Sequence, residues 1–218
     1  MVIMHLDPKD SDAIGRVGAA VRRGAVIVYP TDTVYGIGGN PFDAHVVGRI
    51  VEIKRRDGKP MPVLVSGVEG ALALIEAGGL AMALMQRLWP GALTIVAKRA
   101  AGAPDSPAFG SGTVGVRMPK HDLALKIIEA AGGAVIGTSA NISGRRAARS
   151  IDELDSEVAE SADIIIDAGA APGGQPSTVV EVTSNGGEES WAVIRAGAIG
   201  VDVIKAAAGK EMRRGQRM

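Results

Sequence analysis

Four polar segments interrupt an otherwise apolar sequence, and their side chains could bind anions. They are residues 30–36, 54–56, 138–144 and 176–178. Lys54 and Arg56 supply positive charge, while Thr33, Ser139 and Ser177 supply hydroxyl groups. Cationic side chains and hydroxyl donors are the groups that recognise phosphates and carboxylates. Together, the segments therefore indicate chemistry on an anionic substrate.

Each segment also has a purely structural interpretation. Residues 30–36 fit an Asx or Ser/Thr turn, and basic residues at 54–56 suit a helix C-terminus because the helix dipole favours positive charge there. Ser139 and Asn141 could cap a helix, and the hydroxyl of Ser177 could lie at a strand edge. Taken one at a time, the segments leave both interpretations open.

Other kinds of catalytic site are not supported by the sequence. There is no cysteine, which excludes a thiolate nucleophile, a disulfide framework and a cysteine-ligated zinc site. The three histidines, His5, His45 and His121, are scattered without the spacing of metal ligands. No Walker-type phosphate loop occurs, and Gly36-x-Gly38 lacks the third glycine of a dinucleotide fingerprint. We therefore predict no metal site built from protein side chains.

The elements that must position these segments alternate between helices and strands. Apolar residues at helical spacing predict helices over 11–24, 43–55, 68–88 with a break near 78–79, 121–131, 151–161 and 201–208. Short apolar runs predict strands over 25–29, 62–66, 92–97, 113–117, 134–136, 163–166, 177–182 and 191–195, the last two joined by a long turn. Residues 30–41, 99–112 and 137–150 are expected to be loops. This order predicts an α/β fold on a twisted mixed, partly parallel sheet, with ligands bound by loops beyond the strand ends.

The length and composition are those of one ordinary globular domain. The chain has 218 residues, of which 46% are hydrophobic. We predict a single domain over 1–209 and a frayed basic tail over 210–218. Lys plus Arg and Asp plus Glu both number 24, so global charge does not favour nucleic acid. No signal peptide and no apolar run of about 18 residues is seen, which predicts a cytoplasmic protein without membrane contact.

The polar segments resemble, in their order, the signatures of the YrdC-like threonylcarbamoyl-adenylate synthases. The string YPTDTVYG over 29–36 is similar to that family's opening signature, Lys54-x-Arg56 to its KxR motif, and Ser139-x-Asn141 to its SxN motif. Residues 88–94, 115–119, 177–179 and 194–197 follow in the family's order. The resemblance covers about residues 12 to 200, which is nearly the whole chain.

The resemblance implies a fold and an activity. It implies helices packed with a twisted mixed sheet around a concave groove, in a short, single-domain member of the family. The implied enzyme is an L-threonylcarbamoyladenylate synthase, a nucleotidyltransferase that makes threonylcarbamoyl-AMP and pyrophosphate from L-threonine, bicarbonate and ATP. The adenylate would pass to the downstream machinery that transfers threonylcarbamoyl to adenosine 37 of tRNA. Because these steps bring anions together, positive charge and aligned donors are needed and a covalent nucleophile is not.

The family's motifs also imply roles for individual residues. Thr33, Arg117 and Ser177 would bind threonine and bicarbonate. Lys54 and Arg56 would be catalytic and would also bind ATP. The remaining ATP-binding residues would be Thr113, Ser139, Asn141 and Arg195. Mg²⁺ is expected with ATP, and no tightly bound cofactor is predicted.

Two alternatives stay open at this level. The residues after the KxR motif, 57–62, depart from the family pattern, which leaves open whether Arg55 or Arg56 is the motif arginine. The chain could also be a non-catalytic RNA-binding protein of the same fold, or could contact tRNA as an enzyme. Arg145, Arg146 and Arg149 could supply phosphate contacts or form a solvated loop.

Overall fold

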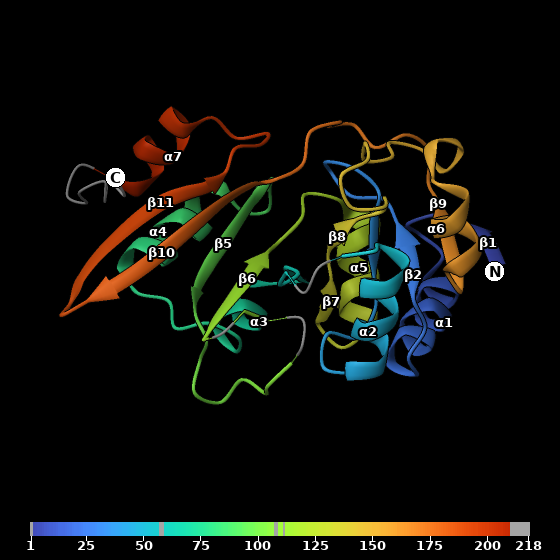
Figure 1. Ribbon diagram of the computed structural model, residues 1–218, viewed down its shortest axis with the longest axis horizontal. Coiled ribbons are helices and arrows are strands. Elements are labelled where there is room, and N and C mark those ends of the chain that lie inside the picture. The colour runs from blue at the N-terminus through green and yellow to red at the C-terminus, as the bar shows by residue number, and fades with distance from the viewer. Residues whose placement is uncertain (1, 57–58, 107–108, 111, 210–218) are drawn as a thin grey trace.

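The computed structural model describes residues 2–56, 59–106, 109–110 and 112–209 (Figure 1). The predicted tail, 210–218, lies outside the described residues. The helices are α1 (Ser11–Arg22), α2 (Ala44–Ile53), α3 (Val68–Leu72), α4 (Gly79–Leu88), α5 (Asp122–Ala130), η1 (Ile151–Glu153), α6 (Ser156–Ser161) and α7 (Val201–Ala208). The strands are β1 (Val2–His5), β2 (Ile27–Tyr29), β3 (Gly36–Gly38), β4 (Val63–Val65), β5 (Leu93–Lys98), β6 (Thr113–Arg117), β7 (Ala134–Ile136), β8 (Thr138–Ser139), β9 (Ile164–Asp167), β10 (Thr178–Asn185) and β11 (Glu188–Arg195).

The strands form two mixed sheets that lie side by side in Figure 1. One has the order β11-β10-β5-β6-β4-β7, with parallel pairs between β10 and β5 and between β4 and β6. The other has the order β1-β9-β2-β3-β8, in which β1, β9 and β2 are parallel and β3 and β8 are antiparallel. The predicted α/β class with a mixed, partly parallel sheet is confirmed, and its strands are divided between two sheets.

One face of the six-stranded sheet is covered by α3, α4 and α7. The other face is covered by α5 at β4 and β7 and is hollowed over β5, β6 and β10. Helices α3, α4 and α7 pack on Leu93, Ile95 and Ala97 of β5. Because side chains alternate along a strand, Thr94, Val96 and Lys98 project from the opposite face. Val114 and Val116 of β6 lie in the same apolar cluster, so Gly115 also faces the hollowed side. The period-2 pattern of these strands therefore creates the floor of a groove.

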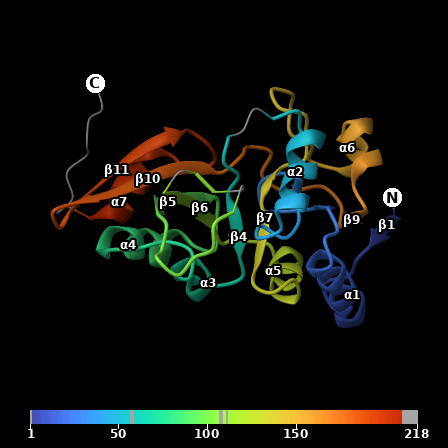
Figure 2. The ribbon, with the colours of Figure 1, turned by 60° about the horizontal axis from the view of Figure 1, so that its bottom comes forward.

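The second group of helices packs where the two sheets approach each other. Helices α1 and α5 lie side by side (Figure 2). Val17 of α1 and Ile127 of α5 share a buried cluster with Tyr29 of β2 and Leu64 of β4. Helices α2 and α6 form another cluster with Ile37 and Ile165 of the five-stranded sheet. The clusters therefore contain residues from both sheets, and apolar burial holds the sheets in one arrangement.

The direct contact between the sheets is made by β3 and β7. The amide of Ile136 donates to the carbonyl of Gly39 at 2.9 Å, and the Tyr29 hydroxyl donates to the Ile136 carbonyl at 2.8 Å. Gly38 lies directly against that carbonyl, where a Cβ atom would overlap it. Residues 30–41 were expected to be a loop, which is wrong for Gly36–Gly38. The sequence does not indicate this strand, because two of its three residues are glycine, which is depleted in strands. Glycine here allows the two backbones to approach closely.

Other boundaries also differ from the sequence-based expectation. The break expected near 78–79 in the helix over 68–88 is present and is longer than expected, because α3 and α4 are separated by residues 73–78. Strands β1 and β8 were not predicted. The turn between β10 and β11 is short, because Gly186 and Gly187 adopt φ values of 61° and 90° that suit a two-residue hairpin.

The described residues contain no helix that is both long and apolar enough to cross a bilayer.

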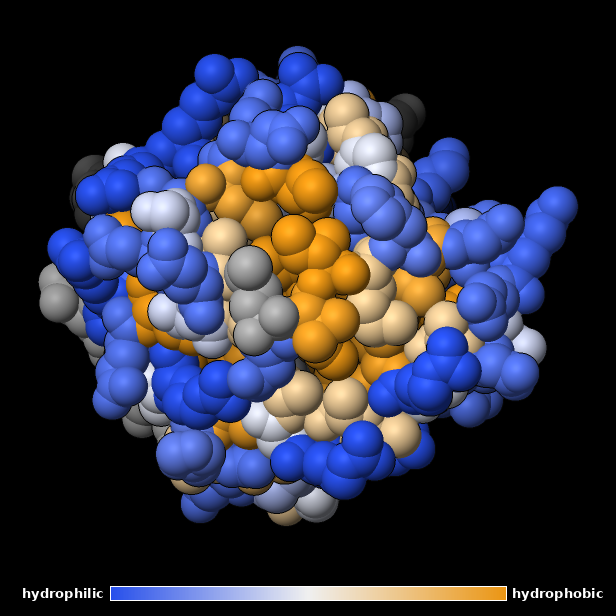
Figure 3. Space-filling view, turned by 90° about the vertical axis from the view of Figure 1, so that its right-hand side faces the viewer, coloured by the Kyte–Doolittle hydropathy of each residue, from blue (hydrophilic) through white to orange (hydrophobic). Residues whose placement is uncertain are grey.

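Strand β1 leaves an apolar edge on the five-stranded sheet. It pairs with β9 on one side, and among the described strands it has no neighbour on the other. Val2 and Ile3 are both about half exposed. Figure 3 faces this end of the molecule and shows apolar surface surrounded by hydrophilic surface. The edge carries no proline or carboxylate that would block pairing with another strand.

The β3–β7 contact predicts unequal effects of two glycine substitutions. Gly38→Ala should lower the free energy of unfolding by about 2 kcal/mol or more, because the new methyl group overlaps the Ile136 carbonyl. Gly48→Ala in α2 is the matched control, since a Cβ there meets no atom within 4 Å. It should raise stability by up to about 1 kcal/mol. Urea denaturation measures both, and equal effects at the two positions would contradict the role given to Gly38.

Candidate functional site

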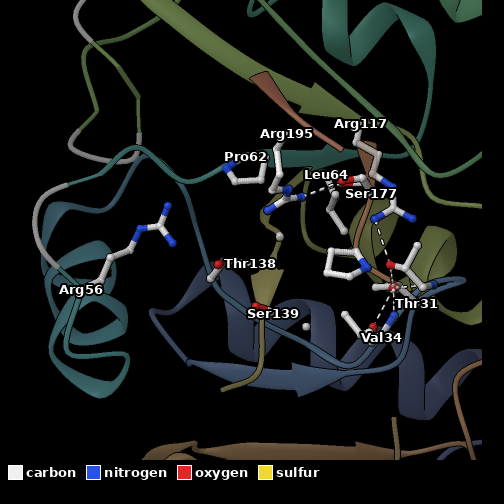
Figure 4. A pocket seen from close by; sticks show the side chains of 14 residues that line it. Thr31, Val34, Arg56, Pro62, Leu64, Arg117, Thr138, Ser139, Ser177 and Arg195 are labelled. Atoms are coloured by element: carbon white, nitrogen blue, oxygen red, sulfur yellow. Dashed lines mark hydrogen bonds between the residues drawn. The ribbon is translucent and has the colours of Figure 1, made fainter. Parts of the chain in front are cut away.

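A pocket lies between the two sheets, at one end of the concave groove (Figure 4). It encloses a volume of about 510 Å³, including its open mouth. Its walls come from the loop after β2, the end of α2, strands β4, β6 and β8, and the ends of β10 and β11. The lining residues are Thr31, Thr33, Val34, Gly36, Arg56, Pro62, Leu64, Arg117, Gly137, Thr138, Ser139, Pro176, Ser177 and Arg195.

The loop after β2 is held by the side chain of Thr31. Its hydroxyl donates to the carbonyl of Val34 at 2.7 Å and accepts from the amides of Thr33 and Val34 at 3.1 and 3.3 Å. The hydroxyls of Thr31 and Thr33 are 2.9 Å apart. A residue outside this loop also holds it, because the amide of Gly174 donates to the carbonyl of Thr33 at 2.6 Å. The Ser/Thr turn that was one interpretation of this segment is therefore present, and Thr33 within it lines the pocket.

Arg117 stands opposite this loop at the end of β6. Its Nη2 donates to Asp32 Oδ1 at 2.6 Å, its Nη1 to Thr33 Oγ at 3.1 Å, and its Nε to the carbonyl of Gly91 at 2.9 Å. The side chains of Arg117 and Asp32 are only 6% and 13% exposed. A guanidinium has five N–H donors, so two remain beyond these contacts with described residues. Arg117 is thus fixed in orientation while keeping donors for a ligand.

Ser177 and Arg195 form the wall beside Arg117 (Figure 4). Arg195 Nη2 donates to the carbonyl of Ser177 at 2.8 Å and to its Oγ at 3.2 Å. The Ser177 hydroxyl is also 2.8 Å from the hydroxyl of Thr94. Burial, followed by the positive charges of Arg117 and Arg56, lowers the pKa of Arg195. Crowded guanidinium groups of this kind attract anions.

The KxR segment is shaped by the way in which α2 ends. Arg55 has a φ of 47°, and its amide donates to the carbonyl of Glu52 at 2.9 Å. The amide of Arg56 donates to the carbonyl of Val51 at 3.0 Å. This pair of bonds is the Schellman motif, with an arginine in the position where glycine is usual. Arg55 turns outward to an ion pair with Glu157, and Arg56 lines the pocket.

Of the two arginines, Arg56 is therefore the one whose side chain lines the pocket. It lines the central pocket and the two hollows that adjoin it. Its Nε and Nη2 donate to the carbonyls of Lys59 and Pro60 at 3.0 and 2.9 Å. Burial lowers the pKa of Arg56 from that of a solvated guanidinium.

Lys54 points inward, toward the SxN segment, and is 1% exposed. Its Nζ donates to the carbonyl of Ser139 and, at 2.8 Å, to the carbonyl of Asn141. Burial, and next the charge of Arg56, lowers its pKa to about 8, against the opposing effect of Asp155. Lys54 lies in a hollow with Ser139 and Asn141 and not on the central pocket's surface. Its contacts make it an anchor for the SxN segment.

Asn141 is also buried, and it presents an acceptor. Its Nδ2 donates to the carbonyls of Ile142 and Arg145 at 3.0 and 2.7 Å. Its Oδ1 is buried and has no hydrogen-bond partner among the described residues. With both donors used, this amide can reach a phosphate only through a cation or a water molecule. The described residues contain no group of three or more His, Asp or Glu side chains that could hold a metal by themselves.

A second hollow continues the pocket along the face of the six-stranded sheet opposite α3, α4 and α7. Arg56, Pro62 and Arg195 belong to both spaces. The second hollow has an apolar floor that includes Val96 and Val179.

The structure therefore divides the predicted site residues among three adjoining spaces. Thr33, Arg56, Arg117, Ser139, Ser177 and Arg195 line the central pocket, Thr113 lines the second hollow, and Lys54 and Asn141 lie in the third.

Sequence reasoning missed four polar residues around the pocket. Thr31, Thr138, Asp32 and Thr94 were not singled out, although the first three lie within the polar segments. Thr31 and Thr138 line the pocket, and Asp32 and Thr94 hold residues that do. Asp32 could have been found from its place beside Thr33, but its partner is 85 residues away in sequence.

The chain is similar to known proteins along most of its length. The Sua5/YciO/YrdC family model, described as "Telomere recombination", matches residues 19–197. The chain is 36% identical to a threonylcarbamoyl-AMP synthase of Pyrococcus abyssi over 75% of this chain and 48% of that protein. It is 36% identical to the threonylcarbamoyl-AMP synthase of Alkalilimnicola ehrlichii, over 84% of this chain and 95% of the relative.

A solved structure is also similar. The crystal structure of P. abyssi Sua5 complexed with L-threonine matches with a TM-score of 0.80 and 31% identity. The match covers 98% of this chain and 61% of that one. The chain therefore spans about half of the Pyrococcus relative's sequence and nearly the full length of the Alkalilimnicola relative.

The Asp32–Arg117 ion pair predicts a large loss of stability when one partner is removed. Asp32→Asn should lower the free energy of unfolding by about 2–4 kcal/mol, because it leaves the guanidinium buried without a counter-charge. Asp202→Asn is the matched control, since it breaks an ion pair whose carboxylate is 96% exposed. That change should cost less than about 0.5 kcal/mol. Urea denaturation of both variants measures the difference, and a loss below about 1 kcal/mol for Asp32→Asn would contradict a structural ion pair.

Proposed function

The chain belongs to the Sua5/YciO/YrdC family, and we propose that it is a threonylcarbamoyl-AMP synthase that uses L-threonine, bicarbonate and ATP and releases pyrophosphate. The central pocket is the observation that carries this proposal. Three guanidinium groups, those of Arg56, Arg117 and Arg195, meet there, and none of the described lining residues is acidic. Such a pocket suits a reaction in which a carboxylate, a carbamate and phosphates come together.

The threonine carboxylate would bind Arg117. The two N–H donors that this guanidinium keeps suit a carboxylate, and its contacts to Asp32 and Gly91 hold it in place. Ser177 lies on the same wall and would contact the rest of the amino acid. The three positive charges disfavour a protonated amine in the pocket, because like charges lower its pKa. The bound amine would therefore be neutral and nucleophilic.

The chemistry then needs two bond-forming steps. The amine nitrogen attacks the carbon of bicarbonate, and loss of water gives a carbamate. A carbamate oxygen attacks the α-phosphorus of ATP, and pyrophosphate leaves with the electrons of the broken P–O bond. Arg56 and Arg195 lie where the central pocket meets the second hollow, so they would stabilise the negative charge shared by carbamate and phosphate.

ATP would occupy the two adjoining hollows. The apolar floor that includes Val96 and Val179 suits the nucleoside, and the hollow lined by Lys54, Lys59 and Ser139 suits phosphates. The oxygen donors there, including the unpartnered Oδ1 of Asn141, fit a Mg²⁺ ion carried by the phosphates, and that ion would neutralise phosphate charge. Lys54 would hold the SxN segment in position for these contacts.

The product would serve tRNA modification in the cytoplasm, since an adenylate of this kind needs an acceptor. The alternative of a non-catalytic RNA-binding protein is less well supported. Both tyrosines, Tyr29 and Tyr35, are fully buried and cannot stack on bases. Of the described aromatic residues, Phe42 and Phe109 pack edge to face on each other.

Pyrophosphate release from the purified protein tests the proposal. Release should require ATP, bicarbonate and L-threonine together, and omission of any one should abolish it. Arg56→Ala should lower kcat/KM by roughly tenfold to a thousandfold, as loss of a transition-state contact does. Arg55→Ala is the matched control and should retain the rate, because that side chain turns outward to Glu157. Release without threonine, or no release with all three present, would reject the synthase.

The lowered pKa of Lys54 predicts a pH limit on the use of ATP. The ammonium is present below about pH 8 and is lost above it, so kcat/KM for ATP should fall as pH rises through 8. This ratio reports ionisation in the free enzyme. Phosphate charge should raise the pKa in the ATP complex, so the corresponding fall in kcat should appear at higher pH.

Lys54→Arg separates this effect from ionisation of the substrates. Arginine does not titrate in this range, so the fall near pH 8 should vanish in the variant even if its overall rate is lower. Both proteins are measured at saturating threonine and bicarbonate. A profile that is identical in shape for the two proteins would show that Lys54 is not the titrating group.

A further inference from the structure

One peptide group of the SxN segment is held between two opposite charges. The carbonyl of Asn141 accepts from the ammonium of Lys54 at 2.8 Å. The amide of Ile142, which belongs to the same peptide group, donates to Asp155 Oδ2 at 3.1 Å. This peptide is trans, so its carbonyl and its N–H point in opposite directions. The ammonium lies at the negative end of the peptide and the carboxylate at the positive end, and the two charge-assisted bonds oppose its rotation.

The carboxylate of Asp155 supports Asn141 by a second route. Its Oδ1 accepts from Arg145 Nη1 at 2.7 Å. The carbonyl of Arg145 in turn accepts from Asn141 Nδ2 at 2.7 Å. Asp155 therefore binds the residue to which the Asn141 side chain is bound, as well as the peptide group that follows Asn141. Both the main chain and the side chain of Asn141 depend on this one carboxylate.

Capping of a helix does not account for the position of Asp155. It directly precedes Ser156, the first residue of α6, where an aspartate usually accepts from an amide of the first helical turn. Its side chain forms no such bond. Both carboxylate oxygens instead accept from residues 142 and 145, and the side chain is 19% exposed. The carboxylate therefore serves the SxN segment and not the helix that it precedes.

We propose that Asp155 is a positioning residue for ATP, which acts by holding the Asn141–Ile142 peptide and with it the side chain of Asn141. This inference rests on the proposed function, because it takes the hollow lined by Ser139 and Asn141 as the site of the phosphates. Asp155 lines none of the three adjoining spaces, so its effect on a ligand must pass through other residues.

The unpartnered acceptor of Asn141 shows why such support is needed. Asn141 is 7% exposed, and its Oδ1 has no hydrogen-bond partner among the described residues. A buried acceptor without a partner is unfavourable, so the side chain would turn toward a donor if its surroundings allowed it. The bonds of Lys54 and Asp155 to the adjoining peptide prevent this rearrangement. Oδ1 is thereby kept available for a cation or a water molecule carried by the phosphates.

ATP binding in the absence of the other substrates tests the proposal. Asp155→Ala should raise the Kd for MgATP in titration calorimetry about tenfold, the effect of a buried amide that has lost its acceptor. Asp155→Asn keeps an oxygen acceptor for the amide of Ile142 and should raise the Kd only about threefold. In steady-state kinetics the KM for L-threonine should change less than about twofold in either variant, because the central pocket is not altered.

Glu157→Ala is the matched control for these variants. It also removes a carboxylate near the start of α6, but that carboxylate pairs with Arg55, which turns outward. Its Kd for MgATP should change less than about twofold. Equal weakening by Glu157→Ala and Asp155→Ala, or an unchanged Kd in Asp155→Ala, would overturn the proposal.

A double variant separates positioning from general support of the fold. If Asp155 acts through Asn141, adding Asp155→Ala to Asn141→Ala should raise the Kd for MgATP less than about twofold further. Fully additive effects would contradict the proposal. If Asp155→Ala does not fold, as judged by circular dichroism, Asp155→Asn takes its place in this comparison.

The role of Asp155 and the proposed function fail in different ways. A protein that binds MgATP but releases no pyrophosphate with L-threonine and bicarbonate would refute the synthase, while the binding comparison would still decide the role of Asp155. Normal pyrophosphate release by the unmodified protein, together with an unchanged Kd for MgATP in Asp155→Ala, would refute the role of Asp155 alone.

Discussion

The close approach of β3 to β7 is the constraint on which the site depends. Gly38 allows one sheet to rest on the carbonyl of Ile136 in the other, and the Tyr29 hydroxyl donates to the same carbonyl. This contact fixes the distance between the loop after β2 and the ends of β6 and β10. Thr33 belongs to the first sheet's loop and Arg117 to the second sheet, so their hydrogen bond exists only because the sheets meet in this way. Side chains on a single sheet could not enclose the pocket.

Local strain at the end of α2 serves the same site. Arg55 adopts a left-handed conformation that costs a non-glycine residue roughly 1 kcal/mol or more. Its ion pair with Glu157 is exposed and offsets little of that cost. The turn instead serves the two residues beside Arg55, which are Lys54 and Arg56. A continued helix would separate Lys54 and Arg56 by about 200° around its axis, whereas the turn lets Lys54 reach the SxN segment and Arg56 reach the pocket.

The sequence predicted those parts of the fold that local patterns specify. Helix α1 and strand β6 were found because apolar periodicity and buried runs are local signals. Strand β3 is Gly-Ile-Gly and β8 is Thr-Ser, so neither has an apolar run of its own, and both were missed. Their pairing with each other joins segments about 100 residues apart. The motif residues were placed by resemblance, but their partners were not. Asp32 with Arg117, and Lys54 with the carbonyls of Ser139 and Asn141, join positions about 85 residues apart, which no local pattern reports.

Electrostatics explain how a chain with no net charge builds a strongly positive pocket. The charges of equal numbers of acidic and basic residues cancel over the whole molecule. The electrostatic potential in a pocket, however, depends on which of these charges lie close to it. Arg56, Arg117 and Arg195 line one pocket, and Asp32, the carboxylate that pairs with Arg117, is not among its lining residues. That carboxylate reduces the cost of burying Arg117, and two N–H groups of the guanidinium remain beyond its contacts with described residues. The same ion pair therefore stabilises the fold and leaves the central pocket lined by positive charge, because Asp32 pairs with Arg117 without joining the lining.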